Sequence, residues 1–330
     1  MRNPVVSACI ITYNQMSFID ECINGALMQR AQFDIEIDIN DDNSNDGTAQ
    51  FCKKVTTANP GKINFYSNQE NLGMIGNWMV ALKRCKGKYV ALCEGDDYWT
   101  DRNKLQKQVE FLEANPDYSI CFHQVNVLED AKKLPSELNH SNKEETYTIL
   151  DLASSNMMHT PSVVFRNGLI KEFPSWFKGS SVADYVLHLL NAKKGMIKYF
   201  PDSMAVYRVH GAGVWGKKSL DEVYPKWIAL LDNLLKEKFD DEVIKILAAQ
   251  KTRKIHEYIT WVLKEKRYEM IKQICLTYLN SPAPDIANVL VDDIVTHINE
   301  LEAMISLIKN SGSYSLATKL SNIKSSFLKQ

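Results

Sequence analysis

Two short acidic clusters constrain this chain more than any other feature, because each stands where an apolar run ends. The first occupies residues 41–48 (DDNSNDGT) and the second residues 94–99 (EGDDYW). An apolar run that ends abruptly in carboxylates places negative charge at the carboxyl edge of a sheet, where open α/β sheets bind ligands. Carboxylates gathered there favour a divalent cation and, through it, a phosphate. Ordinary turn chemistry after a strand is the alternative for either cluster alone.

Apolar runs and helical spacings alternate along the first 125 residues. The runs predict strands at 5–12, 33–40, 63–67, 89–93 and 118–124, and the spacings predict helices at 18–27, from about 48, at 75–86 and at 101–115. Such alternation builds an α/β fold with a mostly parallel sheet and right-handed crossovers. Residues 33–40 alternate strictly between apolar and polar side chains, which predicts a strand with one wetter face near a sheet edge.

The pattern changes in the later part of the chain. Residues 129–146 are polar and lack periodicity, which predicts a mobile loop. After it we expect a short helix near Leu150, an apolar run at 162–166, a helix at 182–194 and a strand pair around 196–208. From Leu220 onward, apolar residues recur at helical spacing, which predicts an all-helical C-terminal region interrupted at Pro282 and Pro284.

The composition is that of an ordinary soluble globule. The 330 residues are 45% hydrophobic and 24% charged. Lys and Arg number 39 against 40 Asp and Glu, and the formal net charge of -1 gives no field that would attract nucleic acid. The N-terminus lacks a charged region followed by a long apolar stretch, and nowhere do about 18 apolar residues run together. We therefore expect neither export nor membrane spanning.

The cysteines favour a reducing, cytoplasmic compartment. They are seven, an odd number without C-x-x-C spacing: Cys9, Cys22, Cys52, Cys85, Cys93, Cys121 and Cys275. Most lie inside apolar patterns, which predicts reduced core residues rather than a disulfide framework or a zinc site. We expect a cytoplasmic protein whose contact with the membrane, if it has one, is peripheral and at the inner face.

At its acidic clusters the chain resembles a known family. DDNSNDGT is similar to the first nucleotide-binding signature, and EGDD to the metal-binding signature, of family 2 glycosyltransferases with the GT-A fold. The resemblance covers roughly the first 215 residues. It implies a catalytic domain at 1–215, with a nucleotide-sugar-binding half at 1–125 and an acceptor half at 126–215. A helical region at 216–330 would follow.

The resemblance implies a set of contacts to the nucleotide. The candidates are Ile11, Tyr13, Asn14, Asp42, Asn71 and Asp96. In similar transferases the tyrosine packs on the nucleobase and the acid after the second strand accepts from its N–H. Near Asn71 the family often carries an arginine, whereas this chain has Met74 and Trp78. A plain turn is the alternative for Tyr13-Asn14 and for Asn71.

The second cluster supplies candidate metal ligands. Asp97 is the first candidate and Asp96 its partner on ribose or metal, with Glu94 a weaker third. One or two carboxylates plus substrate phosphates are what Mg²⁺ uses, and Mn²⁺ accepts the same ligands. The ion would stabilise charge on the departing diphosphate. The alternative is a capped turn before the helix near residue 101.

Asp184 is the candidate catalytic base. Ala183-Asp184 precedes a helical run and matches a Glu-Asp pair of the family, whose Asp takes the proton of the acceptor hydroxyl. Ala183 replaces the Glu, which removes a group that could orient the base. On pattern alone, an Asp before a helix is a common N-cap.

A third segment, Tyr207-Arg208-Val209-His210-Gly211, resembles one in nonprocessive members where the histidine approaches the metal or diphosphate. His210 is therefore a third candidate metal ligand, and a surface histidine is the alternative. The Gln-x-x-Arg-Trp signature of processive synthases is absent. Residues 159–162, Trp176 and Trp215 are candidates to line an acceptor pocket, because aromatic faces stack on sugar rings, although each Trp is as well suited to the core.

The resemblance implies an inverting glycosyltransferase, and the absence of the Gln-x-x-Arg-Trp signature and of membrane-spanning runs favours a nonprocessive one. It would move one sugar from a nucleotide-sugar, with a UDP-sugar expected first, to a hydroxyl of a glycan or lipid-linked acceptor, as in polysaccharide biosynthesis. The helical C-terminal region could pack on the catalytic domain, form a homodimer or lie on a membrane. One alternative is a catalytically inactive sugar-binding or scaffold protein of the same fold. A second, a sugar nucleotidyltransferase, needs a glycine-rich basic loop after the first strand, and residues 12–15 do not form one.

Overall fold

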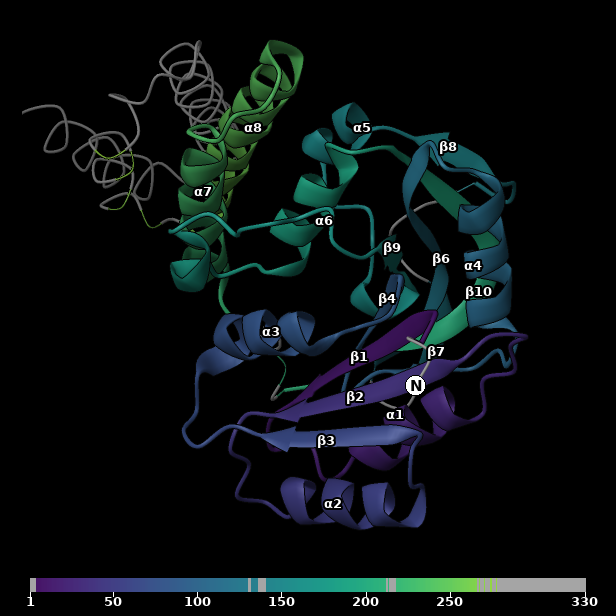
Figure 1. The fold of residues 1–330 in the computed structure, drawn as a ribbon. Helices are drawn as coiled ribbons and strands as arrows, with labels where there is room; N and C mark the ends of the chain where they lie inside the picture. The colour runs from purple at the N-terminus through teal and green to yellow at the C-terminus, as the bar shows by residue number, and fades with distance from the viewer. Residues whose placement is uncertain are drawn as a thin grey trace, which may run out of the picture. The chain divides into compact units, whose positions relative to one another are not determined.

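A computed structural model describes residues 4–129, 132–135, 141–211, 213, 218–265, 267, 270, 274 and 277 (Figure 1). The chain forms two compact units. The first comprises Met1–Ser219 and Ala229–Leu247, and the second comprises Leu220–Ile228 and Ala248–Gln330. The predicted catalytic-domain boundary near residue 215 stays a prediction.

A ten-stranded mixed sheet organises the first unit, in the order β3-β2-β1-β4-β9-β6-β10-β5, with β7 also paired to β6 and β8 to β10. The strands are β1 (Val6–Thr12), β2 (Ile35–Asp41), β3 (Ile63–Ser67), β4 (Tyr89–Glu94), β5 (Tyr98–Trp99), β6 (Tyr118–Glu129), β7 (Lys132–Pro135), β8 (Glu145–Tyr147), β9 (Val164–Arg166) and β10 (Met196–Val209). The four strands β3, β2, β1 and β4 are parallel, whereas β9 runs antiparallel to both β4 and β6. This is the α/β architecture that the alternation predicted.

Helices cover this sheet (Figure 1). They are α1 (Ile19–Leu27), α2 (Thr48–Ala58), α3 (Gly73–Arg84), α4 (Lys104–Ala114), α5 (Ile149–Ser154) and α6 (Asp184–Ala192), with short 3₁₀ turns at Thr160–Ser162 and Phe177–Gly179. Helix α2 packs beside β3, α3 over β1 and β2, and α4 and α6 against β6. The apolar faces of β1, β2 and β4 meet α1 and α4 in one buried core. Every residue of β1 is buried, as a continuous apolar run in a central parallel strand requires.

Strand β2 lies beside the edge strand β3, as predicted, but the prediction that one of its faces is wet was wrong. It lies between β1 and β3, and its residues from Ile37 to Asp41 are all buried. Its polar face is accommodated inside, where Asp38 accepts a hydrogen bond from Asn64 Nδ2 at 2.9 Å. Burial raises the pKa of Asp38 to about 7. The strict alternation of apolar and polar residues in β2 therefore reflects buried, hydrogen-bonded polar side chains and not a solvent-exposed face.

Two further predictions were wrong in detail. The expected loop at 129–146 contains β7, which pairs with β6, and β8, which pairs with β10. The expected strand pair at 196–208 is the single strand β10, whose register against β6 shifts between Phe200 and Ala205. Pro201 stands inside this shift, where a missing N–H is tolerated. The shift lets one strand continue to the site edge and pair with β5 there.

The helical C-terminal region is confirmed over its described part. Helix α7 (Leu220–Leu234) and helix α8 (Asp241–Lys264) are long, and the second unit buries Ile228, Ile255, Ile259 and Val262 in its own cluster. Pro282, Pro284, Trp215 and Cys275 lie outside the described residues. The six cysteines that the structure describes are free thiols in buried positions. Among the described helices, none has the length and apolar composition to cross a bilayer.

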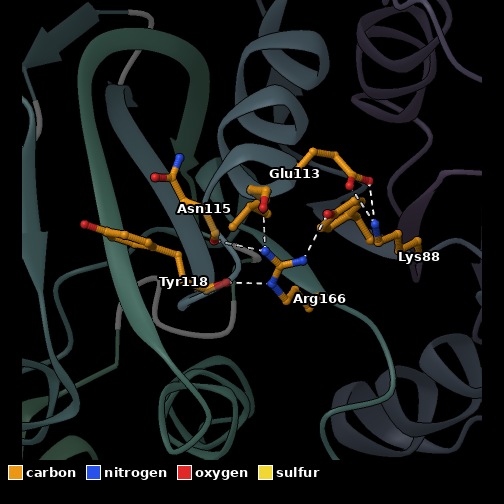
Figure 2. A network of polar contacts seen from close by, with 7 residues as sticks. Lys88, Glu113, Asn115, Tyr118 and Arg166 are labelled. Carbon is orange, nitrogen blue, oxygen red and sulfur yellow. Dashed lines mark hydrogen bonds and ion pairs between the residues drawn. The ribbon is translucent and has the colours of Figure 1, made fainter.

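A half-buried arginine, Arg166, joins α4, β4, β6 and β9 (Figure 2). Arg166 Nε donates to Tyr118 O at 2.7 Å, and Nη2 donates to Leu112 O at 2.5 Å and to Asn115 O at 3.1 Å. The guanidinium thereby adds a charged donor to two carbonyls at the end of α4, each of which also accepts a backbone N–H, Leu112 O from Asn115 N and Asn115 O from Tyr118 N. Close by, Lys88 and Glu113 form an ion pair at 2.6 Å whose side chains are about half exposed.

We expect Arg166→Leu to lower the free energy of unfolding by about 3 kcal/mol, because it removes several hydrogen bonds made by one charged donor. Lys88→Ala in the neighbouring exposed pair should cost less than about 1 kcal/mol. Urea denaturation of both variants measures the difference. Equal losses would contradict the role given to the guanidinium.

Lys104 offers a test of pH dependence. Its side chain is fully buried, Nζ donates to Gln108 Oε1 at 2.9 Å, and burial lowers the pKa of Lys104 to about 7 from its ordinary value of 10.5. Between these two values the unfolded chain binds a proton that the folded protein does not, so stability rises with pH.

As the pH rises from about 7 to about 9, the free energy of unfolding of wild type should therefore increase by about 2 kcal/mol relative to that of Lys104→Met, which lacks the titrating group. Urea denaturation across this range measures it. Lys107→Met, from the more exposed side of the same helix, should show no such trend. Parallel pH profiles for Lys104→Met and wild type would contradict the prediction.

Candidate active site

The register of the parallel strands brings the two acidic clusters together. Thr12 at the end of β1 pairs with Asp41 on one side, and Ile11 pairs with Glu94 on the other. Both clusters therefore flank the end of β1 at one edge of the sheet. The turn after β4 closes onto β1, where Gly95 N donates to Ile11 O at 2.9 Å. A Cβ at Gly95 would lie 2.8 Å from Thr12 Oγ1, so only glycine allows this approach.

Much of the first cluster holds two loops together. Asp46 Oδ2 accepts from Met16 N at 3.0 Å, and Asp41 Oδ2 accepts from Ser44 N at 3.1 Å. Asn14 has φ of 52°, donates from its backbone N–H to Ser44 Oγ and accepts from Asn45 N, each at 2.9 Å. The candidate Asn14 thus sits at the junction of the loops after β1 and β2, with its carboxamide oxygen already engaged.

The other nucleotide candidates differ in exposure. Tyr13 is 46% exposed, so its ring is open to a ligand. Ile11 is buried in β1, and its carbonyl accepts from Gly95 N. Asn71 is exposed, and its Oδ1 accepts from Gly73 N at 2.9 Å at the start of α3. Asp42 is buried, and its Oδ1 accepts from Asn68 Nδ2 at 2.8 Å and from Leu72 N at 2.9 Å.

The second cluster forms a carboxylate triad. Ligand atoms of Glu94, Asp96 and Asp97 all lie within 4.8 Å of one another. Asp96 Oδ1 and Asp97 Oδ2 are buried and, among the residues that the structure describes, have no hydrogen-bond partner. Hard, closely spaced and unpartnered oxygens are a donor set that fits Mg²⁺ or Mn²⁺. The residues present therefore fit the ion that the family implies.

The electrostatics of the triad reflect crowding of like charges. Burial, together with the charges of Asp96 and Asp184, raises the pKa of Glu94 to about 8. Burial, together with the charges of Asp96 and Glu94, holds the pKa of Asp97 well above its usual range. Both effects disfavour ionisation without a counter-charge, and a bound cation would reverse them.

The end of β10 holds the second oxygen of each aspartate. Arg208 N donates to Asp97 Oδ1 at 2.8 Å, and His210 Nε2 lies 2.9 Å from Asp96 Oδ2. The structure thus places the candidate His210 on a candidate ligand, with its ring 4.7 Å from that of Phe18. The Arg208 guanidinium pairs with Glu21 and lies over the ring of Phe18, which ties β10 to α1.

Asp184 lies near the triad, as its effect on Glu94 requires. It is the first residue of α6, whereas the N-cap position belongs to Ala183. Its Oδ2 accepts from Asn156 Nδ2 at 3.2 Å. Burial raises the pKa of Asp184. Burial and then the charges of Glu94, Asp97, Asp184 and Asp96 raise the pKa of Tyr207, so this phenol lies among all four carboxylates.

Of the residues predicted to line an acceptor pocket, some lie at the site and others are buried or bonded elsewhere. His159 stacks near Tyr207, with ring centroids 4.7 Å apart, and so lies at the site. Pro161 and Ser162 are buried, and Pro161 O accepts from Trp99 Nε1 at 2.9 Å. Trp176 Nε1 donates to Glu237 Oε1 at 2.7 Å.

Sequence reasoning missed several residues of this region. Trp78 lowers the pKa of the Glu94 carboxyl against the larger effect of burial, and Asn156 donates to Asp184. Neither belongs to a motif with fixed spacing. The only signal for Trp78 was that it stands where the family often carries an arginine.

Comparisons with known proteins agree with this geometry. The model of the family described as "Glycosyl transferase family 2" matches residues 7–173. An uncharacterised protein of Mycobacterium tuberculosis is 35% identical over 211 residues, which are 64% of this chain and 60% of that protein. The chain therefore spans about 60% of the length of this curated relative.

Solved structures share the fold. The structure of S. aureus TarS 1-349 in complex with UDP-GlcNAc is 17% identical, covers 90% of this chain and 91% of its own, and has a TM-score of 0.61. The mannosyltransferase PcManGT from Pyrobaculum calidifontis, in complex with GDP-Man and Mn²⁺, is 16% identical, covers 90% and 88%, and has a TM-score of 0.57. The GT-A fold class is confirmed. Since the family match covers half of the chain, the protein belongs to glycosyl transferase family 2.

Proposed function

We propose that this chain is a nonprocessive, inverting glycosyltransferase that moves one sugar from a nucleotide-sugar to a hydroxyl of a glycan or lipid-linked acceptor. The observation that carries the proposal is the triad of Glu94, Asp96 and Asp97, two of whose oxygens have no hydrogen-bond partner in the described part of the chain, with the half-buried Asp184 nearby. A UDP-sugar is the donor we expect first. TarS was solved with UDP-GlcNAc and the mannosyltransferase with GDP-Man, which supports the donor class and leaves the base to experiment.

Asp96 and Asp97, with Glu94 as a third ligand, would hold Mg²⁺ or Mn²⁺. When bound, the ion supplies Lewis-acid stabilisation of the leaving diphosphate. His210 would keep Asp96 oriented toward the ion, or join it as a ligand after turning. Arg208 fixes Asp97 through its backbone N–H, so the ligands are held before the donor arrives.

Asp184 would take the proton of the acceptor hydroxyl. The oxygen of that hydroxyl forms a bond to the anomeric carbon, the bond from that carbon to the diphosphate oxygen breaks, and the diphosphate leaves with the electron pair. Attack opposite the leaving group inverts the anomeric centre. Burial raises the pKa of Asp184, which makes this carboxylate a stronger base, and Asn156 holds one of its oxygens.

The nucleoside would lie at the ends of β1 and β2. Tyr13 would pack on the base and Asp42 would accept from its N–H, whereas Ile11, Asn14 and Asn71 would shape the loops around it. Residues 1–215 would form the catalytic domain. Membrane contact and a homodimer stay predictions. An inactive scaffold of the same fold is the alternative that the Ala183 replacement favours.

The first test is a thermal-shift panel of UDP, GDP, dTDP and CDP sugars with and without Mn²⁺, because specific binding raises the melting temperature. We expect a metal-dependent shift with one nucleotide. Asp97→Asn should weaken metal-dependent binding at least about tenfold, and it should not lower the melting temperature of the free protein, since it relieves charge repulsion. Asp20→Asn, an exposed carboxylate of α1, is the control. No shift with any nucleotide would favour the scaffold alternative.

A second test separates catalysis from binding. Asp184→Asn should lower turnover about 10³-fold and leave nucleotide affinity within about threefold, because a general base acts on the acceptor proton. Slow hydrolysis of the donor, in which water replaces the acceptor, can be measured before an acceptor is found. Asp151→Asn removes a carboxylate from the first turn of α5 and should leave turnover unchanged. Equal activity of Asp184→Asn and wild type would exclude Asp184 as the base.

A further inference from the structure

Three side-chain amides form a hydrogen-bonded network beside Asp42. Asn40 and Asn77 are buried and Asn68 is half-buried. Asn40 Nδ2 donates to Asn77 Oδ1 at 2.5 Å and to Asn68 Oδ1 at 3.3 Å. Asn68 Nδ2 donates to Asn77 Oδ1 at 2.9 Å and to Asp42 Oδ1 at 2.8 Å. Asn77 Nδ2 donates to the backbone carbonyl of Asn40 at 3.1 Å. The network joins the ends of β2 and β3 to α3.

Three groups fix which way each amide points. Arg84 Nη1 can only donate, and it donates to Asn40 Oδ1. The carbonyl of Asn40 and the carboxylate of Asp42 can only accept. Flipping any amide would put two donors or two acceptors face to face at one of these anchors. The donors therefore run in one direction, from the Arg84 cation through Asn40 and Asn68 to the Asp42 anion.

This arrangement of hydrogen bonds leaves only Oδ2 of Asp42 able to accept from a ligand. Oδ1 accepts from both Asn68 Nδ2 and Leu72 N, which fills its two lone pairs. In the described part of the chain, Oδ2 has no hydrogen bond, and it is not among the fully buried unpartnered atoms. Because Asp42 is held at one oxygen by two donors, it cannot turn its carboxylate to suit a different ligand.

We propose that Asn40, Asn68 and Asn77, anchored on Arg84, are positioning residues that make Asp42 Oδ2 a fixed acceptor selecting donor nucleobases with a ring N–H. This inference rests on the proposed function. Uracil presents N3–H and satisfies such an acceptor. Cytosine instead has a lone pair on N3, so two acceptors would face each other with no proton between them. A site that leaves polar groups unpaired in this way discriminates strongly against the ligand. The Arg84 guanidinium, which lies over the Tyr66 ring at 4.2 Å, acts on Asp42 through these amides.

The matched experiment compares two asparagines of one strand region. Asn68→Ala removes the donor to Asp42, whereas Asn64→Ala removes an equivalent donor, 2.9 Å from Asp38, away from the site. The measurement is the ratio of UDP to CDP affinity with Mn²⁺ present, by calorimetry. We expect wild type to prefer UDP about 30-fold, Asn68→Ala to lower that ratio about tenfold, and Asn64→Ala to keep it. A loss of stability alone would not change the ratio.

The far end of the network gives a second variant. Arg84→Leu removes the cationic donor and should lower the UDP to CDP ratio, and Arg84→Lys should restore most of it. If wild type binds neither nucleotide, the proposed function fails before the network is tested. If wild type prefers UDP and Asn68→Ala keeps the same ratio, the proposed function stands and the positioning role is overturned.

Discussion

Repulsion among four carboxylates is the interaction on which the rest of the site depends. The register of β1 between β2 and β4 puts both acidic clusters at one edge, and α6 brings Asp184 close to Glu94. Buried like charges are costly, so each must be hydrogen-bonded or neutralised. The end of β10 supplies partners for one oxygen of Asp96 and one of Asp97. The other two oxygens, Asp96 Oδ1 and Asp97 Oδ2, have no hydrogen-bond partner among the residues that the structure describes, which is why the site suits a cation.

Much of this arrangement could be predicted from sequence, since the strongest signals came from continuous patterns. The run before Asp41, the run before Glu94 and the buried strand β1 set the strand order and the shared edge. The strand β2 was predicted, but its wet face was not found. Asp38 and Asn40 are buried, because Asn64 and Asn77 supply hydrogen-bond partners from other elements. Local alternation carries no information on partners that are distant in sequence.

The motif residues also divided in a way that spacing could not reveal. Asp41 and Asp46 belong to the same cluster as Asp42, yet Asp41 binds a backbone N–H of its own loop and Asp46 binds one of the loop after β1, where Asn14 in turn binds Asn45 N. A carboxylate in a turn satisfies either a loop or a ligand, and only its surroundings decide. The strands β7 and β8 were missed for a related reason, because short edge strands are stabilised by the strand beside them more than by their own pattern.

The charge arrangement has a consequence for stability. Glu94 in the folded protein has a pKa of about 8, above its ordinary value of 4.5, so between these values the fold binds a proton that the unfolded chain has lost. Stability therefore falls as the pH rises through this window. A bound cation would favour the ionised form and offset that loss, and ion binding would then be coupled to folding at this edge. The buried core of β1, β2 and β4 must supply the stability that the site gives up.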